Sequence, residues 1–243
     1  MQIMDRIESI EDLKACLSKA KAFRAHNNRP FIIVSYAQSV DGSIASGNRL
    51  PLQLSGPESA ILTHQIRAAS DAILIGIGTL LADDPRLTVR LAEGSDPQPI
   101  ILDTHLRTPR SAKLVTRSDL SPWVVNAEDN HSTRVEALRA AGATPLPCAT
   151  GQDGKIDLRA LMSVLAEMQI NSIMVEGGAK VITSFVQSRL IDQFIITVSP
   201  RLVGGLTVID SNGLNLSTNL ALSHVSYQRL GNDLIIWTRP DWE

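Results

Sequence analysis

The chain has few cysteines and no long apolar run, and both absences limit the classes of protein to which it can belong. Only two cysteines occur in 243 residues, and they stand far apart at Cys16 and Cys148. This spacing excludes a disulfide framework and a C-x-x-C zinc site, and it favours a reducing compartment. No apolar run approaches the length that crosses a bilayer, and the N-terminus lacks the pattern of a secretory signal. We therefore expect a cytoplasmic protein with no membrane partner.

Charge of one sign and metal-binding patterns are also scarce. The net charge of −2 gives no reason to expect a nucleic acid as partner. The five histidines show no metal-ligand spacing, and neither a serine nucleophile elbow nor an H-E-x-x-H motif occurs. The sequence therefore supports neither a metal site nor covalent catalysis. Its apolar fraction of 44% and charged fraction of 20% are typical of a globular protein with a substantial core.

Helix-like and strand-like segments alternate along the chain. Helical spacing and capping residues predict helices at 9–26, 55–69, just after Thr79, 132–141, 158–168 and 181–190. Apolar runs predict strands at 31–37, 72–76, 99–103, 123–126, 172–176 and 193–198. Segments 224–230 and 234–238 are typical of a hairpin. This alternation predicts one α/β domain with a mixed sheet that helices cover on both faces.

Two of the predicted strands end in glycines that precede a helix. The first ending is Gly-Ile-Gly-Thr at 76–79, and the second is Glu-Gly-Gly-Ala-Lys at 176–180. Glycine tolerates positive φ, so such turns can point backbone N–H groups at an anion. Ligands of open α/β sheets bind at this edge, outside the carboxyl ends of the strands. Either loop alone could be a helix cap or a packing glycine, but the two together favour a phosphate-bearing ligand.

Arginines flank the first glycine loop at positions 67, 86 and 90. Arg90 follows the alternating residues 87–89, so we predict that it ends a half-buried strand. From there its guanidinium could clamp a substrate phosphate with two hydrogen bonds. Any one of the three arginines could equally be an ordinary surface residue. Asp41-Gly42 is a strong turn signal and predicts a tight turn after the first strand.

Several ordered motifs together resemble the riboflavin-biosynthesis pyrimidine reductase family. They are Tyr-Ala-Gln-Ser-Val-Asp-Gly-Ser-Ile-Ala at 36–45, Ser-Gly-Pro-Glu at 55–58, Arg67, the segment 71–90 and Val-Glu-Gly-Gly at 175–178. The resemblance begins near Arg29, which divides the chain into an N-terminal helical extension (1–28) and a reductase domain (29–243). It implies a dihydrofolate-reductase-like fold: a mixed, mainly parallel sheet of eight or nine strands, helices on both faces and a C-terminal hairpin. It also implies a homodimer.

The resemblance further implies NADPH-dependent reduction of the ribosylamino group of a pyrimidine 5′-phosphate to a ribitylamino group. In this chemistry the sugar ring opens and a hydride adds at C1′. The family pattern assigns catalytic roles to Glu176 and Asp83. It assigns substrate contacts to Arg67, Arg90, Glu176 and Gln38. It assigns cofactor contacts to Ala37, Thr79, Asp83, Leu87, Thr104, Gly177, Gly178, Ala179, Lys180 and Val181.

The family includes members fused to a zinc deaminase and free-standing members. The deaminase motifs H-x-E and P-C-x-x-C are absent, and the segment 1–28 is far too short for that domain, so we expect a stand-alone reductase. Many fused members carry lysine at the position of Ser35, whereas residues 35–39 resemble the free-standing fungal and archaeal type. The expected substrate is therefore the 2,5-diamino-pyrimidinone. The alternatives are the deaminated 5-amino-uracil compound, dihydrofolate or a pterin, and a non-catalytic nucleotide-binding module.

Overall fold

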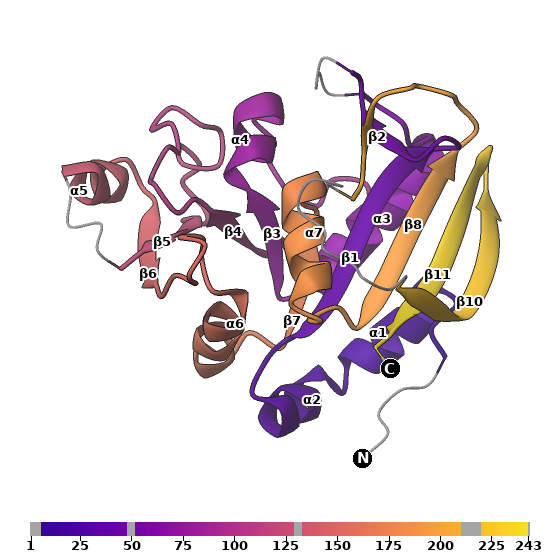
Figure 1. Cartoon of the computed structure of the whole chain (residues 1–243), viewed down its shortest axis with the longest axis horizontal. Helices are drawn as coiled ribbons and strands as arrows, with labels where there is room; N and C mark the ends of the chain where they lie inside the picture. The colour runs from indigo at the N-terminus through magenta and orange to yellow at the C-terminus, as the bar shows by residue number, and fades with distance from the viewer. Residues whose placement is uncertain (1–5, 48–51, 129–132, 210–219, 243) are drawn as a thin grey trace.

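A nine-stranded sheet organises the computed structural model, which describes residues 6–47, 52–128, 133–209 and 220–242 (Figure 1). Its strands are β1 (Phe31–Ser39), β3 (Ala72–Gly76), β4 (Gln98–Leu102), β5 (Trp123–Ala127), β6 (Thr144–Cys148), β7 (Ser172–Val175), β8 (Gln193–Ser199), β10 (Ala221–Leu230) and β11 (Asp233–Asp241). They lie in the order β10-β11-β8-β1-β7-β3-β4-β5-β6. The strands from β8 to β6 in this order are parallel, β11 is antiparallel to β8, and β10 is antiparallel to β11. The predicted mixed, mainly parallel sheet with a C-terminal hairpin is confirmed.

Helices cover both faces of this sheet, as predicted. They are α1 (Ile10–Leu17), α2 (Ala20–Asn27), α3 (Pro57–Ala69), α4 (Ile77–Asp83), α5 (Thr133–Ala140), α6 (Leu158–Glu167) and α7 (Ala179–Gln187). Ile32 and Val34 of β1 pack with α6 and α7, whereas Phe31 and Ile33 pack with α1, α2 and α3. Successive side chains of a strand point to opposite faces, so α7 lies in front of the sheet and α3 behind it (Figure 1). Within the described ranges, no helix is long and apolar enough to cross a membrane.

The N-terminal segment forms two helices, so the prediction of a single helix over 9–26 is wrong. The Ser18 hydroxyl donates to the carbonyl of Ala15 (2.7 Å), and the Lys19 N–H donates to the carbonyl of Cys16, three residues back (3.0 Å). These bonds tighten the last turn of α1 and let the chain start α2 in a new direction. Leu13 and Phe23 consequently point into the same core. The predicted boundary between 1–28 and 29–243 therefore separates segments that share a core.

Two further elements lie outside the prediction. The edge strand β6 contains Pro145 and Pro147, which cannot donate to a ladder. Because the prolines alternate, the remaining N–H groups of β6 can face its one neighbour, β5, and Thr144 donates to the carbonyl of Pro122 at 2.9 Å. The second element is a small sheet of β2 (Ser43–Ala45) and β9 (Leu206–Thr207), whose strands are too short to show a period.

The turn predicted at Asp41-Gly42 is present, and its carboxylate connects β1 to the segment before β9. Asp41 accepts hydrogen bonds from the Ser39 and Ser43 hydroxyls (2.6 and 2.8 Å) and from the N–H groups of Val203 and Gly204 (2.9 and 2.8 Å). These donors, the Ser39 hydroxyl first, hold the pKa of the Asp41 carboxyl well below its usual range. The turn motif therefore has a structural role in this fold.

Candidate active site

The predicted site residues gather where β1, β7 and β3 end, because these strands are parallel neighbours. Val175, the last residue of β7, pairs with Val34 of β1 and Leu74 of β3. The Glu176 N–H donates to the carbonyl of Leu74 at 3.0 Å, which fixes the start of the second glycine loop beside β3. β1 runs on past this level to residues 37–38. Both glycine loops therefore lie at the edge of the sheet where ligands of such folds bind.

Two glycines at this edge make room for one valine. A Cβ atom on Gly76 would lie 2.6 Å from Cγ2 of Val181, and one on Gly177 would lie 2.6 Å from its Cβ. Neither glycine has a positive φ, and Gly76 is extended, with φ −89° and ψ 156°. β3 runs directly into α4 at Ile77, so the positive φ that glycine tolerates is not used at 76–78. Gly76 and Gly177 let α7 pack closely on the ends of β3 and β7.

The contacts with Val181 predict different responses to substitution. Gly76→Ala and Gly177→Ala should each lower the free energy of unfolding by about 1–3 kcal/mol through overpacking. Val181→Ala removes the Cγ2 atom that meets position 76, so it should relieve Gly76→Ala. It keeps the Cβ atom that meets position 177, so Gly177→Ala should remain destabilising. Urea unfolding of the single and double variants measures this, and equal rescue of both glycine variants would contradict the packing role.

Gly78 and Gly178 face open space instead. Within the described part of the chain, and apart from its own helix turn and chain neighbours, no atom lies within 4 Å of a Cβ built on Gly78. A Cβ on Gly178 would meet Oγ1 of Thr79 at 3.4 Å. α4 and α7 both begin here, and neither first turn has a side-chain cap among those residues. The partial positive charge of the α7 start and the exposed Lys180 favour an anion. This surface therefore has the space and the charge to receive an anionic group.

Arg67 and Glu176 form a charged pair at the same edge. Nε of Arg67 lies 2.6 Å from Oε1 of Glu176, and Nη2 lies 2.7 Å from Oε2. The two side chains are 12% and 17% exposed. Burial by itself would lower the pKa of Arg67, but the attraction and hydrogen bonds of Glu176 outweigh it and raise that pKa. Each carboxylate oxygen keeps a lone pair that can accept a hydrogen bond from a ligand.

Arg90 lies in a loop, so the prediction of a strand over 87–90 is wrong. Leu87 has φ +53°, which breaks an extended run, and its side chain is 3% exposed in the core beneath α4. A ligand contact of Leu87 would therefore come from its main chain. The carbonyl of Thr88 accepts a hydrogen bond from Nη1 of Arg67 at 3.1 Å. Arg67 thus connects Glu176 to the loop that carries Arg90.

The remaining predicted residues surround this centre at different distances along the edge. Asp83 ends α4 at the surface, but the atoms packed around its carboxyl exclude part of the surrounding water, and this desolvation raises the pKa of the carboxyl. Gln38 is half-buried on β1, beyond the end of β7. Thr104 follows β4, one strand further out than β3, and its carbonyl accepts the N–H of Ala127 at 3.2 Å. In the described ranges, no group of three His, Cys, Asp or Glu side chains lies close enough to hold a metal ion.

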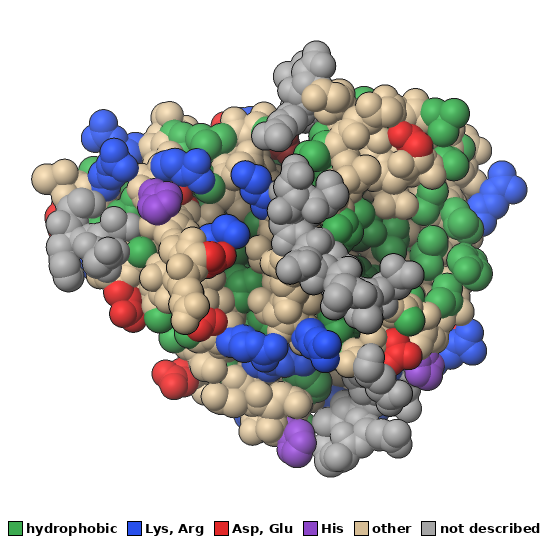
Figure 2. Space-filling model, viewed as in Figure 1, with side chains coloured by type: hydrophobic (Ala, Val, Ile, Leu, Met, Phe, Trp, Pro, Cys, Tyr) green, Lys and Arg blue, Asp and Glu red, His purple; other side chains and the backbone are tan. Residues whose placement is uncertain are grey.

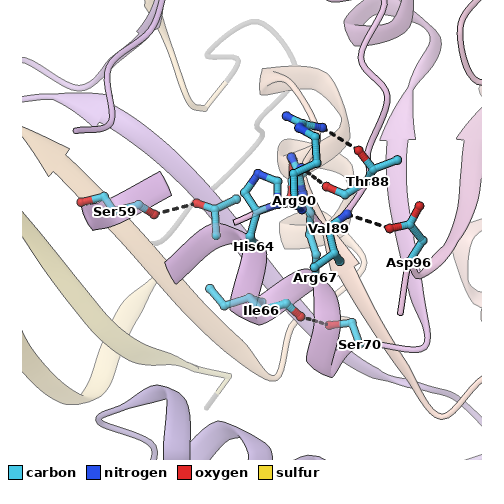
Figure 3. A network of polar contacts seen from close by, with 11 residues as sticks. Ser59, His64, Ile66, Arg67, Ser70, Thr88, Val89, Arg90 and Asp96 are labelled. Atoms are coloured by element: carbon cyan, nitrogen blue, oxygen red, sulfur yellow. Dashed lines mark hydrogen bonds and ion pairs between the residues drawn. The ribbon is translucent and has the colours of Figure 1, made fainter. Parts of the chain in front are cut away.

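Sequence reasoning missed two side chains that hold the Arg90 loop (Figure 3). Nδ1 of His64 accepts the Arg90 N–H at 2.9 Å, and Oδ1 of Asp96 accepts the Val89 N–H at 2.7 Å. His64 stands three residues before Arg67, so both lie on the same side of α3. That spacing is the signal that could have found it. Asp96 carries no such signal, because it approaches from an irregular segment.

Comparison with known proteins finds relatives along most of the chain. The family model of the RibD C-terminal domain matches residues 30–236. Riboflavin biosynthesis protein RibD of Actinobacillus pleuropneumoniae is 30% identical over 212 residues, a match that covers 86% of this chain and 56% of that protein. This chain therefore spans little more than half of that relative's length. The 2,5-diamino-6-ribosylamino-4(3H)-pyrimidinone 5′-phosphate reductase of Methanothermobacter thermautotrophicus is 32% identical over 216 residues, which cover 86% of this chain and 97% of that one.

Solved structures of two related proteins share the fold. RibD of Acinetobacter baumannii superimposes with a TM-score of 0.80 at 25% identity, covering 95% of this chain and 63% of that one. The riboflavin biosynthesis reductase Rib7 of Saccharomyces cerevisiae superimposes with a TM-score of 0.73 at 28% identity, covering 95% of this chain and 100% of that one. The arrangement of sheet and helices is therefore common to the three proteins.

Proposed function

This chain belongs to the RibD C-terminal domain family, and we propose that it is an NADPH-dependent pyrimidine reductase of riboflavin biosynthesis. The proposed reaction reduces the ribosylamino group of a pyrimidine 5′-phosphate to a ribitylamino group. The favoured substrate is the 2,5-diamino-pyrimidinone compound, because this chain matches almost the full length of the archaeal relative named for it. The observation that carries the proposal is the Arg67–Glu176 pair: Glu176 leads into the start of α7, which has no side-chain cap among the described residues, and Arg67 also donates to the Arg90 loop.

The proposed cofactor surface is formed by Thr79 and residues 177–181. A bound nicotinamide cofactor would supply the hydride that reduces C1′ of the sugar. The open space above Gly78 and Gly178 admits a diphosphate, and the first-turn N–H groups of α7 and the Lys180 ammonium would bind it. Ala37, at the end of β1, and Thr104, after β4, would contact the cofactor on either side.

On the substrate side of the proposed site, each polar or charged side chain has a separate role. When the sugar ring opens, the bond between C1′ and the ring oxygen breaks and the ring oxygen takes up a proton from an acid. C1′ then accepts the hydride. Asp83 is the better proton donor of the two proposed catalytic carboxyls, because its pKa is raised, whereas both oxygens of Glu176 already accept hydrogen bonds from Arg67. Glu176 would accept hydrogen bonds from the substrate, Arg90 would bind the 5′-phosphate, and Gln38 would contact the pyrimidine.

A turnover assay tests this proposal. The purified chain should oxidise NADPH with the diamino compound faster than with the deaminated 5-amino-uracil compound, and not with dihydrofolate. Parallel assays with NADH measure the preference for the cofactor. Turnover with dihydrofolate but with neither pyrimidine would identify a pterin-type reductase. Binding of NADPH without turnover of any of these substrates would identify a non-catalytic nucleotide-binding module.

We also propose that the protein acts as a cytoplasmic homodimer. β10 is an edge strand of the sheet, and apolar side chains on the β10–β11 hairpin reach the surface (Figure 2). Leu222, Tyr227 and Leu234 are 43%, 67% and 40% exposed. An exposed apolar edge of this kind favours association with another chain, and the scarcity of cysteine fits a reducing compartment. Sedimentation equilibrium measures the oligomeric state.

A further inference from the structure

The loop of residues 88–90 takes its shape from side chains that bond its main chain (Figure 3). Arg67 donates to the first carbonyl at 3.1 Å, Asp96 accepts the next N–H at 2.7 Å, and His64 accepts the N–H of Arg90 at 2.9 Å. These residues lie outside the strands. These hydrogen bonds are partly buried, and main-chain groups shielded from water need partners. The three side chains therefore decide where the loop lies.

Each of the three side chains is itself fixed. Arg67 is held by both oxygens of Glu176. Asp96 is held by Arg117, whose Nη2 lies 2.6 Å from its Oδ2. His64 is 5% exposed and lies on the buried side of α3. Of the three, only histidine changes its charge near neutral pH in its unperturbed state. His64 is therefore the contact of this loop that can respond to pH.

The contact with Arg90 requires a neutral imidazole. Nδ1 of His64 accepts a hydrogen bond, so it carries no proton, and the ring proton is on Nε2. Burial first, and then the positive charges of Arg67 and Arg90, lower the pKa of His64 below 6.5, while Glu176 and Asp96 act in the opposite direction. The imidazole is consequently neutral at pH 7, and the loop is held.

We propose that His64 is a positioning residue for Arg90: its neutral ring fixes the loop that presents the Arg90 guanidinium to the substrate phosphate. In Figure 3 this guanidinium points away from α3, and it donates to the Thr88 hydroxyl at 2.6 Å. The role of the loop follows from its hydrogen bonds, and the identity of the phosphate rests on the proposed function. His64 should thus govern the affinity for the pyrimidine and leave the affinity for NADPH unchanged.

Two substitutions of His64 distinguish the role of its hydrogen-bond acceptor from the role of its side-chain size. His64→Asn keeps an acceptor where Nδ1 stands, whereas His64→Leu has a similar size and no acceptor. His64→Leu leaves the Arg90 N–H unpaired, so kcat/KM for the pyrimidine should fall about tenfold, with KM for NADPH unchanged. His64→Asn should recover most of that loss. The control is Gln65→Ala. Gln65 is the next residue on α3 and lines a surface hollow with Lys14 and Glu93, so this variant should behave as wild type.

The pH profile adds a readout that a merely structural role would not move. As pH falls below 6.5 and through the lowered pKa of His64, the ring gains a proton and the contact is lost. KM for the pyrimidine should therefore rise toward acid pH. The substrate phosphate also titrates, with a pKa of about 6, and this component should persist in His64→Asn. The His64 component should be absent from that variant.

Amide hydrogen exchange at Arg90 tests the loop without substrate. The Arg90 N–H should be protected in the wild type and in His64→Asn, and should exchange rapidly in His64→Leu. Long-range ¹H–¹⁵N correlation should show an unprotonated Nδ1 on His64 at pH 7. Equal protection in all three proteins, or equal kinetics of the Asn and Leu variants, would overturn the inference. Failure of the wild type to reduce either pyrimidine would overturn the proposed function alone, because the exchange data would still decide the role of His64.

Discussion

Glu176→Gln should lower kcat/KM by about a hundredfold or more and also destabilise the fold. The substitution preserves size, but it turns an amide NH₂ toward the guanidinium and removes the charge that balances Arg67. Breaking a largely buried ion pair from one side costs about 3–5 kcal/mol, and the residual exposure of this pair reduces that to about 2–4 kcal/mol. In the proposed reaction the substrate donates hydrogen bonds to this carboxylate, and Gln offers one neutral acceptor oxygen in place of two charged ones, which accounts for the kinetic effect. Steady-state kinetics and urea unfolding measure the two effects.

A double variant separates the two consequences. Arg67→Met with Glu176→Gln removes both charges, so no unpaired ion remains buried and most of the stability should return. Activity should not return, because the carboxylate and its connection to the Arg90 loop are both absent. Recovery of turnover in the double variant would show that Glu176 acts only through stability. Wild-type turnover in Glu176→Gln would remove Glu176 from the catalytic assignment.

At the amino ends of the strands, opposite the candidate site, Asp192→Ala should be the most destabilising single substitution. Asp192 precedes β8, is 7% exposed, and binds both Nη atoms of Arg29 at 2.6 and 2.7 Å. It also accepts the buried N–H of Ile32 at 2.8 Å. The pair joins the starts of β1 and β8, and Arg29 stacks on the ring of Phe23 at 5.0 Å. The expected loss is about 3–5 kcal/mol of unfolding free energy, because one side of a buried pair is removed.

Matched variants calibrate that loss. Asp192→Asn keeps an acceptor for the Ile32 N–H and should cost about half as much. Asp153→Ala breaks an exposed pair with Lys155, whose atoms lie 3.0 Å apart, and should change stability by less than about 0.5 kcal/mol. Because Asp192 lies at the amino ends of the strands, the folded fraction of each variant should keep its specific activity. A loss for Asp192→Ala no larger than that for Asp153→Ala would contradict the account.

The sequence predicts most of the sheet, and its misses have physical causes. The run at 72–76 is apolar throughout, and it matches β3 at both ends. β6 is not predicted because its alternating prolines are disfavoured in most strands, although an edge strand tolerates them. The break between α1 and α2 is not predicted because the helical spacing of apolar residues continues through Ser18 over residues 9–26. That break depends on where Phe23 meets the core, which is a tertiary effect.

The site is predicted less completely than the fold. A glycine in the sequence does not tell whether a ligand or a side chain occupies the space beside it. Val181 fills that space at Gly76 and Gly177, whereas Gly78 and Gly178 remain open. His64 and Asp96 act on a loop whose approach to α3 no local pattern encodes. The residue types at the edge were predictable, and their division into packing, positioning and ligand-facing groups required the structure.

Transfer of deuterium from labelled NADPH tests the central claim most directly. The chain would be incubated with the diamino compound and with NADPH carrying deuterium at C4, using both the 4R- and the 4S-labelled forms. We expect one of the two forms to deliver its deuterium to C1′ of a ribityl chain, and we expect the pyrimidine ring to stay unlabelled. Deuterium in the ring, or no transfer from either form, would contradict the central claim.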